Sequence, residues 1–150
     1  AEHETAAWVV AVAEDAAALA EDRQLRLVVE PNEAGAARFD RALLRQLVLN
    51  LVANAVRVSP PGGTITLRST RAGPDWRLEV LDEGPGLPAA QLERVFERFV
   101  TAEGPAATPS AGHGLGLTIC RSIARLHGGT IRAHNRTDRS GLGMTVLLPP

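Results

Sequence analysis

Residues 43–57 read Leu-Leu-Arg-Gln-Leu-Val-Leu-Asn-Leu-Val-Ala-Asn-Ala-Val-Arg, and their apolar positions recur at helical spacing. Asp40 precedes this stretch at the position of a helix N-cap. The sequence Pro60-Pro61-Gly62-Gly63 follows it as a strong helix breaker. The pattern therefore predicts a long amphipathic helix that ends near Val58.

Two asparagines of this helix, Asn50 and Asn54, are four residues apart and share one face, which Gln46 and Arg57 extend. Asparagine is a poor helix-interior residue because its amide competes for backbone hydrogen bonds. Amide oxygens suit a hard cation such as Mg²⁺, which usually completes its shell with phosphate and water. The alternative is an asparagine ladder that hydrogen-bonds a neighbouring loop.

Outside the long helix, the hydrophobic pattern predicts alternating helices and paired strands. Helices are expected at 4–21, 89–94 and 115–126, and strands at 25–30, 36–39, 64–70, 76–81, 130–133 and 144–148. Strands in adjacent pairs favour an α/β sandwich, in which helices pack on one face of a single mixed sheet. Residues 100–113 are rich in Ala, Pro, Gly, Ser and Thr, and a loop of that length is usually functional or mobile.

The composition excludes several chemistries. All sixteen basic residues are arginine, so the chain has no lysine for a Walker-type phosphate loop, a protein-kinase fold or a Schiff base. The net charge is −1 and no run of arginines occurs, which argues against binding to nucleic acid. One cysteine cannot form an internal disulfide, and this fits a reducing compartment.

The length of 150 residues predicts one domain over 1–150. The longest apolar stretch, Ala6 to Ala13, is far too short to span a membrane, and no signal peptide is recognisable. The chain opens in the middle of a pattern with Ala1-Glu2-His3, so we expect it to be a fragment of a longer protein.

The segment Asp82-Glu83-Gly84-Pro85-Gly86-Leu87 follows a predicted strand. By period two, Asp82 falls on the apolar face of that strand, where an unbonded carboxylate is costly. As a pure acceptor it suits an amino group such as the exocyclic amine of adenine. Gly84 and Gly86 allow the backbone to approach a ligand closely. The alternative is an ordinary turn.

Two further segments flank the predicted loop. Gly112-His113-Gly114-Leu115-Gly116-Leu117 directly precedes a predicted helix, and glycine-rich backbone before a helix N-terminus is typical of an anion site. It is not the dinucleotide-binding fingerprint, and the alternative is a flexible hinge. Phe96-Glu97-Arg98-Phe99 predicts a small apolar cluster that anchors the loop.

In this order, these segments resemble the ATP-binding catalytic domain of bacterial sensor histidine kinases, in the superfamily shared with gyrase, Hsp90 and MutL. The resemblance covers nearly the whole chain. The similar boxes are Asn50–Asn54 (N box), Asp82–Gly86 (first glycine box), Phe96–Phe99 (F box), Gly112–Leu117 (second glycine box) and Gly141–Thr145 (last box before the C-terminal strand). The implied fold is the Bergerat α/β sandwich, with a mostly antiparallel mixed sheet, helices on one face and a flexible ATP lid.

The resemblance also implies roles for individual residues. Asp82 would hold the adenine amine, with Thr145 nearby through water, and Asn54 would bind Mg²⁺ beside Asn50. Arg57 would contact phosphate oxygens, for which an arginine fork is well suited. The further implied ATP contacts are Gly84, Gly86, Leu87, Phe99, Gly112, His113, Gly114, Leu115, Gly116 and Leu117.

The sequence departs from the family pattern at two places. Val58 stands where an aromatic residue often follows the basic residue of the N box. Val100-Thr101 stands where an aromatic residue and an arginine usually follow the F box. If that arginine neutralises the γ-phosphate, the role passes to Arg98 or Arg57, and these two complete the predicted catalytic set with Asn50 and Asn54.

None of His3, His113, His127 and His134 lies in a motif like that of the phosphoacceptor helix. The histidine that receives the phosphoryl group would therefore come from a separate dimerisation domain of the same protein. A response regulator would then receive the phosphoryl group from that histidine. Cys120 lies between Ile119 and Ile123 and is expected in the core. The resemblance implies a monomeric cytoplasmic fragment without direct membrane contact, cut from a membrane-anchored homodimer.

Three alternatives stay open. The first is an anti-sigma-factor serine kinase of the same fold, which the F box disfavours. The second is an ATPase of the Hsp90 or MutL kind, in which a glutamate four residues before the metal-binding asparagine activates water. Asn50 occupies that position and cannot act as a base. The third is a non-catalytic nucleotide-binding module.

Overall fold

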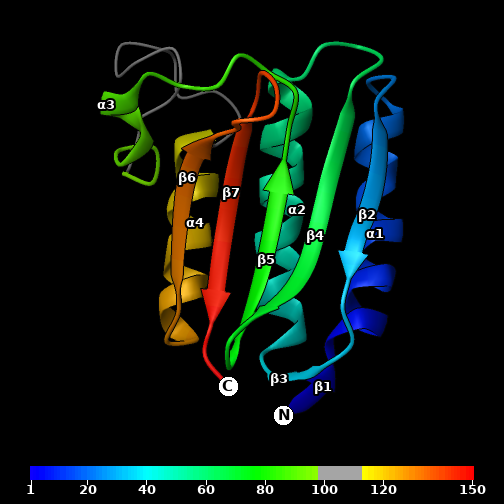
Figure 1. Ribbon diagram of the computed structural model, residues 1–150, viewed down its shortest axis with the longest axis vertical. Helices are drawn as coiled ribbons and strands as arrows, with labels where there is room; N and C mark the ends of the chain where they lie inside the picture. Colours follow the sequence, from blue (N-terminus) through cyan, green and yellow to red (C-terminus); the bar gives the residue numbers. More distant parts are fainter. Residues whose placement is uncertain (98–112) are drawn as a thin grey trace.

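Five strands form one sheet in the order β2-β4-β5-β7-β6, and three helices cover one of its faces (Figure 1). The computed structural model describes residues 1–97 and 113–150, with the backbone alone for 113–115. The strands of this sheet are β2 (Arg26–Asn32), β4 (Thr64–Ala72), β5 (Asp75–Leu81), β6 (Thr130–Asn135) and β7 (Leu142–Leu148). The covering helices are α1 (Thr5–Glu21), α2 (Arg41–Val58) and α4 (His113–Leu126).

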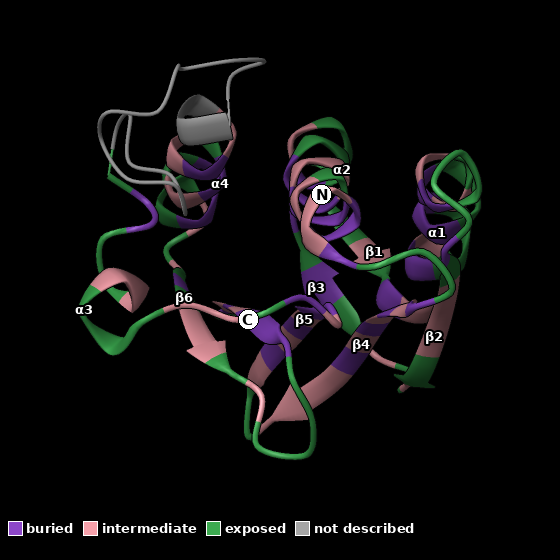
Figure 2. Ribbon diagram, turned by 90° about the horizontal axis from the view of Figure 1, so that it is seen from above, coloured by how far each residue is buried: buried purple, intermediate pink, exposed green. Residues whose placement is uncertain are grey.

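Seen from above, the three helices lie in a row on one side of the sheet (Figure 2). β2 and β4 are parallel, whereas β4–β5, β5–β7 and β7–β6 are antiparallel. The predicted α/β sandwich with a mostly antiparallel mixed sheet is therefore confirmed. Two short strands, β1 (Glu2–Glu4) and β3 (Ala36–Arg38), pair separately, and the short helix α3 (Ala89–Leu92) lies beside the outer edge of β6.

The predicted N-cap of α2 is confirmed, because the Asp40 carboxylate accepts a hydrogen bond from the backbone N–H of Leu43 at 2.9 Å. The cap satisfies one of the donors that a helix N-terminus leaves without an intrahelical partner. The apolar face of α2 is buried through residues such as Leu44, Leu47 and Leu51. α2 thereby runs across the centre of the sheet and carries Asn50 and Asn54.

The core beneath the helices follows the period-two pattern of β5. Trp76, Leu78 and Val80 are buried on the helix side. Trp76 packs against the rings of Trp8 and Phe39, with ring centroids 5.8 and 5.0 Å apart. Its indole Nε1–H donates to Ser69 Oγ at 2.9 Å inside this buried cluster.

Several element boundaries differ from the prediction. β2 continues through Pro31 to Asn32, because an edge strand tolerates a missing N–H group. β6 and β7 are each two residues longer than expected, and α4 begins at His113 rather than Leu115. The short strand β1 was not predicted, and it exists because it pairs with β3. These differences arise from strand pairing, which local sequence patterns do not encode.

The Trp76–Ser69 hydrogen bond gives a stability prediction. Ser69→Ala leaves the buried indole N–H without an acceptor and should lower the free energy of unfolding by about 1–3 kcal/mol. The matched control is the neighbouring Thr70→Val, since the Thr70 hydroxyl is buried and makes no hydrogen bond to any described residue. Urea unfolding of both variants measures the effect. An equal loss of unfolding free energy in the two variants would contradict a stabilising role for the Trp76–Ser69 hydrogen bond.

Candidate functional site

The site centres on Asp82, which follows β5 directly and is 2% exposed. Its Oδ1 accepts the backbone N–H groups of Gly84 and Leu142, both at 2.9 Å. Its Oδ2 accepts no hydrogen bond from any residue that the structure describes. Burial raises the pKa of Asp82 despite these two N–H donors. The result is a buried carboxylate with one oxygen left for a donor from a ligand.

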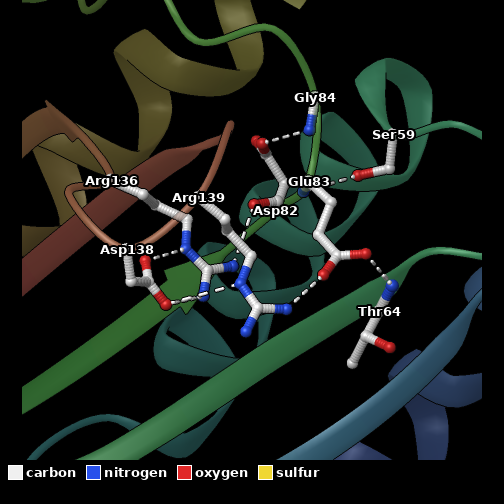
Figure 3. Close-up of polar contacts among 8 residues, drawn as sticks. All are labelled: Ser59, Thr64, Asp82, Glu83, Gly84, Arg136, Asp138 and Arg139. Atoms are coloured by element: carbon white, nitrogen blue, oxygen red, sulfur yellow. Dashed lines mark hydrogen bonds and ion pairs between the residues drawn. The ribbon is translucent and has the colours of Figure 1, made fainter.

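The loop between β6 and β7 holds the Asp82 segment in place, as Figure 3 shows. The Arg136 guanidinium donates to the Asp82 carbonyl at 3.1 Å and pairs with both carboxylate oxygens of Asp138, at 3.1 and 2.9 Å. The hydrogen bonds from Arg136 are the largest cause that lowers the pKa of Asp138 to about 2. Ser140 Oγ donates to the Gly84 carbonyl at 2.6 Å. The loop thus fixes the backbone on both sides of the carboxylate.

Glu83 points away from Asp82 and ties the segment to the sheet (Figure 3). Its carboxylate accepts from the backbone N–H of Thr64 and from the Arg139 guanidinium, each at 2.9 Å. The bond from Thr64, followed by that from Arg139, lowers the pKa of Glu83. The Glu83 N–H donates to Ser59 Oγ at the end of α2, at 3.2 Å. Glu83 is therefore a structural residue of the site.

The two glycines of the segment are explained by contacts within the protein. A Cβ on Gly84 would lie 2.8 Å from the Val58 carbonyl oxygen, so only glycine lets the segment approach the end of α2 this closely. Gly86 has a φ of +74°, and its neighbour Leu87 exchanges two backbone hydrogen bonds of 2.8 Å with the Asn135 amide. Both glycines thus allow close contacts within the protein, and their approach to a ligand stays a prediction.

The contact at Gly84 brings the C-terminal end of α2 against the Asp82 segment. On the last turns of α2, Arg57 Nη2 donates to Asn54 Oδ1 at 2.8 Å. The Asn50 side chain instead interacts with the thiol of Cys120 on α4 and lowers the pKa of that thiol, against the larger effect of burial. Cys120 is fully buried, as predicted, and burial raises the pKa of its thiol to about 12.

The N-terminal half of α4 joins the same region. Thr118 Oγ1 donates to the Phe96 carbonyl at 3.1 Å, and the Cys120 thiol reaches the Leu47 carbonyl on α2 at 3.5 Å. Leu117, from the second glycine segment, is buried in the core. The structure therefore gathers Asn54, the Asp82 segment and the start of α4 at one end of the molecule, opposite the end that holds both chain termini (Figure 1).

Some predicted site residues lie outside the described part of the chain. These are Arg98, Phe99, Gly112 and the Val100-Thr101 departure, together with most of the predicted lid. His113, Gly114 and Leu115 are described by their helical backbone only, and Gly116 continues the same helix.

The prediction that Thr145 lies near Asp82 is wrong. Thr145 pairs with Glu79 in the sheet, and its hydroxyl donates to the Glu79 carboxylate at 3.3 Å on the face that no helix covers. Met144, which pairs with Val80 and is 3% exposed, lies on the Asp82 side instead. Leu142, Met144 and Val146 alternate in the sequence and share the apolar face of the strand. This alternation is the sequence signal that places Thr145 on the opposite face.

Comparison with known proteins decides the family. A family model described as "Histidine kinase-, DNA gyrase B-, and HSP90-like ATPase" matches residues 39–150. The chain belongs to this family. The family supports ATP binding, and its sensor-kinase members support a kinase role in two-component signalling.

Among curated relatives, the sensor protein SphS of Synechococcus elongatus is 38% identical over 137 residues, which cover 87% of this chain and 33% of SphS. The histidine-protein kinase/phosphatase MprB of Mycobacterium sp. (strain KMS) is 40% identical over 114 residues, which cover 73% of this chain and 22% of MprB. The chain thus spans a third or less of the length of these two family members.

Solved structures match over nearly the whole chain. The mycobacterial sensor histidine kinase MprB has a TM-score of 0.81 at 27% identity, covering 99% of this chain and 97% of that one. The catalytic domain of the histidine kinase ThkA has a TM-score of 0.84 at 27% identity, with coverage of 99% and 94%. The predicted resemblance to sensor histidine kinase catalytic domains is confirmed. In the part of the chain that the structure describes, no helix combines the length and the hydropathy that a membrane span requires.

The raised pKa of Asp82 gives a pH prediction through Asp82→Asn, which keeps an oxygen for both N–H donors but removes the charge. In the pH window between the unfolded and folded pKa values, the folded chain binds a proton that the unfolded chain has lost. The stability of the wild type relative to the variant should be greatest below about pH 4 and fall as the pH rises through the raised pKa. Urea unfolding at several pH values measures this difference, and a difference that grows with pH would contradict the prediction.

Proposed function

We propose that the chain binds Mg²⁺-ATP and donates the γ-phosphate to a histidine on a separate dimerisation domain, from which an aspartate of a response regulator receives it. The observation that carries this proposal is the buried Asp82 carboxylate, whose Oδ2 is open beside the end of α2. An ionised carboxylate accepts hydrogen bonds only, so it selects a ligand with an N–H donor. The exocyclic amine of adenine is such a donor.

The phosphate end of the nucleotide would lie along α2, where Asn54 and Arg57 already meet. Arg57 supplies a fork of donors for phosphate oxygens. Among the described residues there is no cluster of three His, Cys, Asp or Glu side chains that could hold a metal ion unaided. Asparagine oxygens fit Mg²⁺ when phosphates and water supply the other ligands. Mg²⁺ bound there would neutralise charge on the phosphates, and Arg57 would turn from Asn54 Oδ1 toward the phosphate oxygens.

The residue type at position 50 favours phosphoryl transfer to an acceptor over hydrolysis of ATP. The Asn50 side chain is an amide, and an amide cannot take a proton from water. A dissociative phosphoryl transfer needs positioning and charge neutralisation more than it needs a protein base. Within the family, the chain therefore fits a phosphate donor better than an ATPase. Arg98, with Arg57, stays the proposed source of positive charge at the γ-phosphate, and Phe99 and the 112–117 backbone stay proposed nucleotide contacts.

The wider setting is also a proposal. This chain covers a third or less of the relatives SphS and MprB, so we propose that the parent is a membrane-anchored homodimer with this domain in the cytoplasm. An anti-sigma-factor serine kinase of the same fold is the competing function, and the chemistry of the phosphorylated product separates the two.

Calorimetry of ATP binding tests the site. Asp82→Asn turns an acceptor toward the adenine amine into a donor and should weaken binding about 10- to 100-fold, with or without Mg²⁺. Asn54→Ala should weaken binding in Mg²⁺ and have little effect in EDTA. Thr145→Val is the matched control on the other face of the sheet and should bind as the wild type does. Full affinity in both site variants would refute the site.

Phosphotransfer is tested by mixing the chain with the phosphoacceptor domain of a sensor kinase and radiolabelled ATP. We expect an acid-labile, base-stable phosphoprotein on the added domain, and negligible ATP hydrolysis by the chain alone. An acid-stable product would indicate the serine kinase, and rapid hydrolysis without an acceptor would indicate an ATPase.

A further inference from the structure

We propose that the outer edge of β6 is a docking site for an extended acidic segment of a partner protein, which adds to the sheet as a sixth strand. The site lies apart from Asp82 and the nucleotide residues, so it does not depend on the proposed function. It is built from the open backbone of β6, a groove beside it and three arginines.

The backbone of β6 is open because β6 is the last strand of the sheet. The Arg136 N–H donates to the Gly141 carbonyl at 2.9 Å, which makes these two residues a hydrogen-bonded pair. Antiparallel pairing alternates, so residues 130, 132 and 134 bond to β7 while Ile131 and Ala133 direct their N–H and C=O groups outward. These groups bond to no residue that the structure describes.

A groove of about 510 Å³ runs along this edge, between β6, α3 and α4. Ile131 and Ala133 line it, so the outward backbone groups face the space where another strand would lie. Leu92 of α3 and the buried Phe96 supply apolar surface opposite the strand. An added strand would therefore find both backbone partners and pockets for alternate side chains.

The charges around the groove select an acidic occupant. Arg121 and Arg125 of α4 and Arg132 of β6 line it, and none of the three forms an ion pair with any described residue. Among the described residues that line the groove, Glu93 is the one acidic residue. Three cations against one anion attract a segment that carries Glu or Asp at every second position.

The opposite edge of the sheet, formed by β2, is less regular than the β6 edge. β2 contains Pro31, which has no N–H, and its pairing with β4 shifts register between Val29 and Asn32. Proline and irregular pairing are devices that protect an edge from additional strands. β6 pairs with β7 in continuous register and contains no proline. The regular edge is thus the one that faces the groove.

The same charges argue against a second copy of this chain as the occupant. Two β6 edges paired about a two-fold axis would bring Arg132 of each copy toward the arginines of the other, and like charges at an interface are costly. A heterologous acidic strand has no such penalty.

The probe is a fluorescein-labelled hexapeptide that alternates glutamate and valine, titrated with the 150-residue chain at low salt while fluorescence anisotropy is read. We expect saturable binding that weakens as salt is added. Arg125→Glu and Arg132→Glu should each weaken it by at least about tenfold. Arg68→Glu, an arginine of β4 outside the groove, is the matched control and should have a much smaller effect.

Two variant peptides separate strand addition from simple charge attraction. Methylation of alternate backbone nitrogens, on the side that faces β6, should weaken binding about tenfold, whereas methylation on the other side should not. A peptide with glutamine in place of each glutamate should not bind, because it lacks the negative charges. The proposal is overturned if the methylated peptides bind alike, if the glutamine peptide binds equally, if no binding is seen at millimolar peptide, or if sedimentation shows that the chain pairs with itself through this edge. Far-UV circular dichroism and urea unfolding of the arginine variants report that they remain folded.

Discussion

The carboxylate of Asp82 is held between the end of β5 and the start of β7 by two backbone N–H groups on one of its oxygens. Most of the site depends on this arrangement. An ionised carboxyl at 2% exposure is costly unless it is bonded, and the raised pKa of Asp82 reflects that cost. The two N–H donors offset part of the cost through Oδ1, which leaves Oδ2 for a ligand.

The surroundings of Asp82 are organised to keep this geometry. Arg136 binds the carbonyl of the same residue, Glu83 anchors the next residue to Thr64 and Arg139, and Gly84 lets the segment pack against the end of α2. Through these contacts the sheet, the β6–β7 loop and α2 meet at one end of the molecule. The family supports ATP binding, and this end of the molecule is where we propose that ATP binds.

The edge of β6 is the second proposed binding site of this fold. One face of the sheet is covered by helices, and the sheet ends at β6 beside an arginine-lined groove. The proposed nucleotide site and the proposed strand-docking site then lie on the two sides of α4, whose residues contribute to both regions. A partner seated on β6 would contact the helix that also carries the second glycine segment.

The sequence by itself determined the elements and several local roles. Helical spacing predicted α2, the Asp40 cap was confirmed, and period two placed Asp82 on the buried face, because these features depend only on neighbouring residues. Local alternation assigns the face of Thr145, but the tertiary structure alone decided that its partner is Glu79, that Gly84 meets Val58 and that Asn50 reaches Cys120. It also decided that β6 is an edge strand. Those relations join residues far apart in the chain, and strand order and helix packing, which set them, leave no signal in any local stretch of sequence.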